Sequence, residues 1–160
     1  MSPEPDPVSP LTRTVIGQLQ KIMGGQPGMR QLELALRLLA KWRSQVLANT
    51  LRMRSGTRVL AGPFQGMQFD LTPAEGALAT RLLGSYEASL APVLEQVIAR
   101  GYEQVIDIGC AEGYYAVGLA RRMPTARILA HDIDPAAREK TGALAAANDV
   151  ADRVLVGGRI

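Results

Sequence analysis

The stretch 105–119, VIDIGCAEGYYAVGL, constrains the fold of this chain more than any other. It starts as an apolar run typical of a buried strand, turns at Gly109 and Gly113, and continues as the start of a helix. An acidic residue, Asp107, stands at the carboxyl end of the expected strand. This order is typical of a nucleotide-binding turn, because ligands of parallel α/β sheets lie beyond the carboxyl ends of the strands.

Strand and helix patterns keep alternating after this turn. The alternation predicts three strands and two connecting helices, at 104–108, 114–123, 127–130, 135–148 and 153–156. The short connections favour right-handed crossovers, and right-handed crossovers produce a parallel sheet. Residues 85–160 are therefore expected to form an α/β fold, a partial Rossmann-like doubly wound parallel sheet in the order β-α-β-α-β.

The N-terminal part of the chain has a different pattern. Residues 1–10 contain four prolines and are expected to form a disordered tail. Residues 11–56 carry apolar side chains at helical spacing on both sides of a glycine-rich break. They predict a basic α-helical region whose second helix is long, covering about 29–54.

Residues 57–84 link this helical region to the expected sheet. Two short β-rich runs around a Gly/Pro turn predict a small β-hairpin. A helix should follow, starting at Thr72 and ending before Gly84. Ser85 is expected to cap the next helix, which Gly101 would end just before the first strand.

The charge of the chain is divided unevenly. Residues 1–60 carry nine Lys/Arg and three Asp/Glu, whereas residues 61–160 carry nine and twelve. The basic helix 29–54 holds Trp42 between two cations, so it could bind a protein partner or an anionic surface. A solvated helix surface with a packed Trp42 is the alternative. Nucleic acid is a less favoured ligand, because aromatic residues are not interleaved with the arginines.

Composition excludes several classes of protein. The only cysteine, Cys110, leaves no disulfide within the chain and no cysteine-based metal site. No apolar run is long enough to predict a transmembrane helix, and the acidic, proline-rich start is not a secretory signal. These features favour a reducing, cytoplasmic location.

The spacing of the glycines separates two kinds of nucleotide site. A dinucleotide fingerprint, G-x-G-x-x-G, fails here because Ala111 and Tyr114 stand where its second and third glycines belong. The run 107–113, DIGCAEG, instead resembles motif I of the class I S-adenosylmethionine-dependent methyltransferases, D/E-x-G-x-G-x-G, with Ala111 replacing the middle glycine. Asp132 at the end of the next strand resembles the acid of that family's second strand. A domain that binds another nucleotide, or none, is the alternative.

The resemblance implies S-adenosylmethionine as the cofactor and methyl transfer as the reaction. It implies that the turn lies along the cofactor through Gly109, Cys110, Ala111 and Gly113. It further implies that Asp107 lies near the methionyl amino group, Asp132 near the ribose hydroxyls and Ile133 against the adenine. Cys110 is interpreted as a small turn residue, since the sequence places no general base beside it.

A segment before the first strand could close such a pocket. Tyr86 and Glu87 lie there, and Tyr114 opens the helix after the glycine-rich turn, so these three are candidate lid residues. The alternative for Glu87 is ordinary helix-start chemistry, because an acid near a helix N-terminus is stabilised by the helix dipole. The sequence predicts neither the catalytic residues nor the methyl acceptor.

The family's sheet is larger than the three strands expected here. The first strand would then have an unpaired apolar edge, which favours association with a partner or with a second copy. The chain is thus interpreted as the cofactor-binding part of an incomplete methyltransferase domain, expected to bind cofactor weakly and to show no turnover alone. The second hypothesis is a non-catalytic adaptor that binds a partner or an anionic surface through the helix 29–54.

Overall fold

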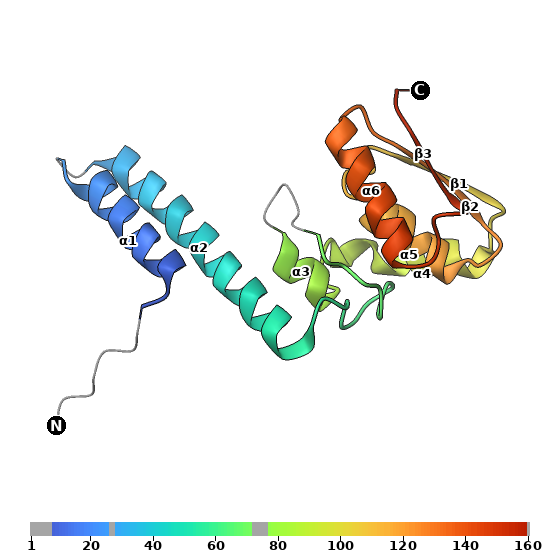
Figure 1. Ribbon diagram of the computed structural model, residues 1–160, viewed down its shortest axis with the longest axis horizontal. Helices are drawn as coiled ribbons and strands as arrows, with labels where there is room; N and C mark the ends of the chain where they lie inside the picture. Colours follow the sequence, from blue (N-terminus) through green and yellow to red (C-terminus); the bar gives the residue numbers. More distant parts are fainter. Residues whose placement is uncertain (1–7, 26–27, 72–76, 160) are drawn as a thin grey trace. The chain divides into compact units, whose positions relative to one another are not determined.

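The computed structural model describes residues 8–25, 28–71 and 77–159. The chain divides into two compact units, Met1–Thr50 and Leu51–Ile160 (Figure 1). Within the described ranges, no helix is both long enough and apolar enough to cross a membrane. Residues 1–7 of the expected disordered tail lie outside these ranges, and the expectation is wrong at Pro10, which begins a helix.

The first unit is a pair of helices, α1 (Pro10–Met23) and the longer α2 (Met29–Ser55), whose last residues belong to the second unit. The Ser9 hydroxyl caps α1 by accepting from the N–H of Thr12 at 3.2 Å. The indole N–H of Trp42 donates to the Thr12 hydroxyl at 3.2 Å, so this side chain joins the two helices. Trp42 is half-buried at this contact, and binding of a partner or an anionic surface through the helix 29–54 stays a prediction.

The expected hairpin is present but short, with one antiparallel bridge between Arg58 and Gln68 and backbone hydrogen bonds on either side of it. Side chains from this segment pack inward, and the most buried are Val59, Phe64, Met67 and Phe69. Asn148 fastens the segment to the end of a later helix, because its side-chain amide exchanges two hydrogen bonds with the Gln68 backbone, at 2.8 and 2.9 Å. The segment thus forms part of the core of the second unit.

Three short helices precede the sheet: α3 (Leu78–Leu83), the 3-10 turn η1 (Ala88–Leu90) and α4 (Ala91–Arg100). The expected start at Thr72 lies outside the described residues, and α3 begins only at Leu78. Gly84 ends α3 with a φ of 74°, and a Cβ there would lie 1.8 Å from the Ala61 carbonyl oxygen. Ser85 caps neither of the next two helices, because the N-cap of η1 is Glu87 and that of α4 is Leu90, so that expectation is wrong.

The sheet follows the predicted alternation of strands and helices. Its elements are β1 (Gln104–Ile108), α5 (Tyr114–Arg122), β2 (Arg127–His131), α6 (Pro135–Ala147) and β3 (Val154–Gly157). The strands are parallel in the order β1-β2-β3, with Ile106, Leu129 and Leu155 in register across them. The mixed α/β fold with a parallel sheet is thus confirmed.

The two faces of this sheet differ. Helices α5 and α6 pack against one face, where Ile128 and Ala130 of the central strand are fully buried (Figure 1). On the other face Ile106 is 56% and Ile108 is 76% exposed. Strand β1 lies at the edge, and no described strand pairs with its second side. The expected unpaired, apolar first strand is therefore observed in the described part of the chain.

Candidate functional site

The glycine-rich turn after β1 is built from three residues with positive φ. These are Gly109 at 78°, Ala111 at 48° and Gly113 at 84°. The N–H of Gly109 donates to the carbonyl of His131 at 2.8 Å, which fixes the turn to the end of β2. A Cβ on Gly113 would lie 2.9 Å from Thr141, so glycine is required there by close packing as well as by conformation. Ala111 adopts the left-handed conformation without being glycine, and this costs free energy.

Two side chains hold the strained Ala111 peptide. The carboxylate of Asp132 accepts from the Ala111 N–H at 2.9 Å through one oxygen, and from the N–H of Asp134 at 2.9 Å through the other. The Thr141 hydroxyl on α6 donates to the Ala111 carbonyl at 2.9 Å. Asp107 and Asp132 therefore belong to the same site, since Asp132 directly contacts the turn that follows Asp107.

Asp107 is an acid with one oxygen left without a protein donor. Its Oδ2 is buried and accepts no hydrogen bond from any described residue. Burial raises the pKa of this carboxyl, a backbone hydrogen bond from Ala116 opposes the shift, and the negative charge of Asp132 adds to it. A buried carboxylate in this state is stabilised by a positively charged group, so the site has the chemistry to hold an ammonium ion.

Cys110 and Ile133 occupy opposite environments. The Cys110 side chain is buried, and its sulfur lies 3.6 Å from the Thr141 hydroxyl. Burial raises the pKa of the thiol, which keeps it neutral and unsuited to nucleophilic attack. Ile133, directly after Asp132, is 81% exposed and is available for contact with a flat ring.

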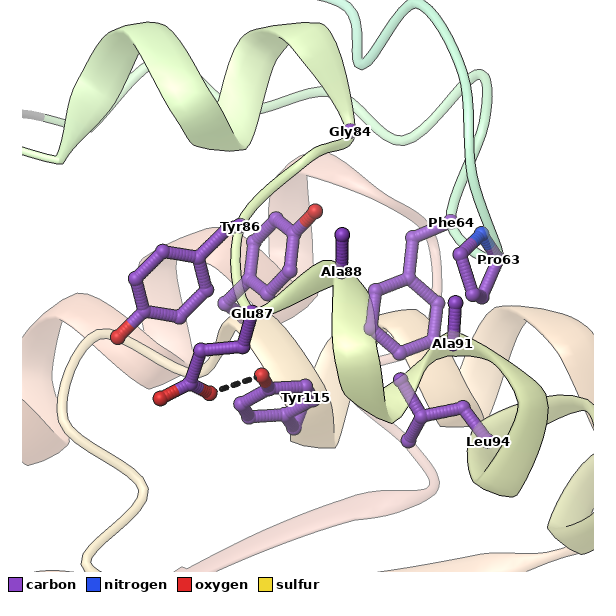
Figure 2. Close-up of a pocket in the computed structure, with 10 residues that line it drawn as sticks. Pro63, Phe64, Gly84, Tyr86, Glu87, Ala88, Ala91, Leu94 and Tyr115 are labelled. Carbon is purple, nitrogen blue, oxygen red and sulfur yellow. Dashed lines mark hydrogen bonds between the residues drawn. The ribbon is translucent and has the colours of Figure 1, made fainter.

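A small pocket lies between the segment before β1 and the start of α5 (Figure 2). Its lining comes from four regions of the second unit, and the residues are Pro63, Phe64, Gly84, Tyr86, Glu87, Ala88, Ala91, Leu94, Tyr114 and Tyr115. None of the motif residues from Asp107 to Gly113 lines it. The structure therefore brings Tyr86 and Glu87 together with the start of α5, but separately from the glycine-rich turn.

The three candidate lid residues have different surroundings in this pocket. Tyr114 is only 6% exposed and packs edge-on against Phe64, with ring centroids 5.3 Å apart. Burial raises its pKa to about 12. Tyr114 is thus a core residue at the pocket wall, which is not the environment of a mobile lid. Glu87 is exposed and has a φ of 46°, and its carboxylate accepts a hydrogen bond from the Tyr115 hydroxyl (Figure 2).

A buried ion pair lies next to the turn, and the sequence gives no signal for it. The Nη1 of Arg81 on α3 lies 2.6 Å from the Oε1 of Glu112 in the turn, and both side chains are 5% exposed. The guanidinium also lies over the ring of Tyr86, 4.1 Å from its centroid. Glu112 is visible in the sequence as a charged residue inside the motif 107–113, but no spacing rule pairs it with Arg81. Thr141 was missed for the same reason.

Neither protein-family models nor curated proteins match this chain. One matching solved structure is an O-methyltransferase family protein from Burkholderia thailandensis, with 21% sequence identity and a TM-score of 0.39. The match covers 75% of this chain and 37% of that protein, so the chain spans well under half of its length. At this level of similarity the likeness assigns neither a family nor a function to the chain.

Proposed function

We propose that the turn after β1 binds S-adenosylmethionine, and that the chain is the cofactor-binding part of a methyltransferase. The observation that carries the proposal is the buried Oδ2 of Asp107, which has no hydrogen-bond donor among the described residues. The amino group of a methionyl moiety supplies the positive charge and the N–H donors that such an oxygen requires.

The surroundings of Asp107 fit the rest of the cofactor. A Cβ on Gly109 would meet no protein atom within 4 Å, so that side of the turn is open to a ligand. Asp132 uses one lone pair of each oxygen locally, which leaves capacity to accept from the two ribose hydroxyls. Ile133 offers an exposed apolar surface for the adenine.

In this proposal the residues of the turn bind and orient, and the bound cofactor supplies the electrophilic methyl group. Asp107 and Asp132 fix the two ends of the cofactor, while Gly109, Ala111 and Gly113 allow the backbone to approach it. Correct orientation contributes most of the acceleration of such a transfer, because the nucleophile and the methyl group must be in line. Tyr86 and Glu87 are proposed to border the site from the neighbouring pocket. The catalytic residues and the acceptor are not assigned.

Calorimetric titration of the 160-residue chain with S-adenosylmethionine tests the proposal. We expect weak binding, with a Kd above about 100 μM, because one face of the sheet is exposed. Asp107→Asn and Asp132→Asn should each weaken binding by about tenfold or more. Asp152→Asn, an exposed acid outside the turn, is the matched control and should change nothing. Absence of binding at millimolar cofactor would contradict the proposal, whereas wild-type binding by both turn variants would contradict the assigned roles.

The alternative function is a non-catalytic adaptor. In residues 8–25 and 28–50 six Lys/Arg face a single acid, Glu33, so the first unit is strongly basic. Under this alternative α2 binds an acidic protein or an anionic surface, and the exposed edge of β1 offers a second contact for a partner. Binding would then weaken steeply with salt and would not respond to Asp107→Asn or Asp132→Asn. A cytoplasmic location is proposed for either function, in keeping with the buried free thiol of Cys110.

A further inference from the structure

The helical pair of the first unit exposes large apolar side chains along one side. We define the apolar stripe as the exposed members of this group, which are Ile16 and Met23 of α1, and Met29, Leu32, Leu36, Leu39 and Leu47 of α2. Their exposures range from 38% for Leu39 to 73% for Met29. Apolar patches of several hundred Å² are uncommon on monomers and mark interaction surfaces.

Helix geometry places both halves of the apolar stripe on the same side of the pair. Val15 of α1 and Ala35 of α2 are buried and mark the sides where the helices meet, and the second buried residue of α2, Ala48, lies closer to its C-terminal end. Ile16 and Leu36 each follow one of them by one position, which is a rotation of about 100° in the same sense. The helices α1 and α2 run antiparallel (Figure 1). Equal rotations therefore bring the two sets to the same side.

Along α2 the apolar stripe has the spacing of a coiled-coil seam. Met29, Leu32, Leu36 and Leu39 alternate steps of three and four residues, as the a and d positions of a heptad do. The series continues through Arg43. This seam is separate from the buried side at Ala35, so α2 has one contact surface for α1 and a second one for another helix.

The charged residues of α2 indicate which kind of partner fits the seam formed by Met29, Leu32, Leu36 and Leu39. The cations Arg30, Arg37 and Lys41 lie on the side of α2 away from Leu36, so the seam from Met29 to Leu39 carries no charge, as the core of a helix pair requires. Only Arg43 interrupts it, and a parallel pairing of two copies would place Arg43 against Arg43. An antiparallel pairing instead places Arg43 of each copy beside Glu33 of the other.

We propose that two copies of this chain associate through the apolar stripe, with α2 packed antiparallel against α2 of the second copy. In this arrangement Leu36 lies opposite Leu39 of the second copy, and Arg43 lies in the layer of Leu32, next to Glu33. A two-fold axis repeats each contact, so the surface is complementary to itself. The two helical pairs then form a four-helix bundle whose core is the apolar stripe.

Sedimentation equilibrium of the full chain over a wide concentration range tests this proposal. The expected particle has twice the 17.2 kDa mass of the chain. Leu36→Glu buries a charge in the seam and should weaken dimerisation by about 100-fold or more. Leu34→Glu is the matched control, because Leu34 is also exposed, at 46%, but lies on the other side of α2. Circular dichroism of both variants verifies that the helices still form.

A charge exchange tests the antiparallel alignment without changing the apolar residues. Glu33→Arg and Arg43→Glu should each weaken the dimer by about fivefold, and the double variant should restore wild-type affinity. A monomer at every concentration, or a dimer that Leu36→Glu leaves unchanged, overturns the proposal. A dimer without recovery in the double variant overturns the antiparallel alignment. Binding of a monomer to phosphatidylserine vesicles, lost in Leu36→Glu, would show a membrane as the occupant and also overturn it.

Discussion

The carboxylate of Asp132 accepts a hydrogen bond from the backbone N–H of Ala111 at 2.9 Å. The acid at the end of β2 thereby holds the turn that follows β1, at the residue where the turn is conformationally strained. If the cofactor is bound as proposed, the same carboxylate has two tasks, one in the turn and one at the ribose. A substitution of Asp132 should therefore affect both stability and binding, and unfolding and titration experiments measure the two effects apart.

Ala111→Gly should stabilise the chain. Glycine adopts a φ of 48° without the steric cost that a Cβ imposes, so we expect a gain of about 1 kcal/mol in the free energy of unfolding. Urea unfolding monitored by circular dichroism measures it. Ala143→Gly, at an exposed position inside α6, is the matched control and should lose about 1 kcal/mol. Equal losses in both variants would show that position 111 is not strained.

Asp132→Ala should destabilise the chain even without ligand. The change removes the acceptor for two backbone N–H groups, those of Ala111 and Asp134, and should cost about 1 to 3 kcal/mol. Asp132→Asn retains one acceptor oxygen and should cost less. Amide hydrogen exchange at Ala111 reports the effect locally. Unchanged protection of that amide in Asp132→Ala would contradict the hydrogen bond.

Asp107→Asn should raise the melting temperature by a few degrees near neutral pH while weakening cofactor binding. Burial raises the pKa of the Asp107 carboxyl in the folded state, so the fold is penalised once this group ionises. Wild-type stability is fully retained below the unfolded-state pKa and falls as pH rises through the raised folded-state pKa. Melting curves from about pH 3 to pH 7 should therefore diverge from those of Asp107→Asn toward neutral pH. Parallel curves would remove the argument for a buried charge at this site.

The ion pair between Arg81 and Glu112 should be strongly coupled. Arg81→Met leaves a buried, unpaired carboxylate in the turn and should cost about 3 to 5 kcal/mol. The double variant Arg81→Met with Glu112→Gln should recover part of this loss, because no buried charge remains. Chemical unfolding of the single and double variants gives the coupling energy. Additive losses would indicate that the two side chains act independently.

Much of the second unit could be predicted because its signals are local. Runs such as 104–108 and 127–131 are strand-like, and each is followed by residues that turn the chain and start a helix. The position of Asp132 at the end of β2 follows directly from this alternation. The expected small hairpin is present as one antiparallel bridge between Arg58 and Gln68, but the burial of Phe64 and Phe69 in the core was not visible in the local pattern.

By itself the sequence determined the order of strands and helices, the parallel sheet and the pair of acids at its carboxyl edge, because periodicity and turn residues act over short distances. Only the tertiary structure decided the contacts between distant segments. It paired Arg81 with Glu112, placed Thr141 against the turn, buried Tyr114 and set Ala111 at positive φ. Such contacts depend on how packed elements meet in three dimensions, and no local spacing in the sequence encodes that.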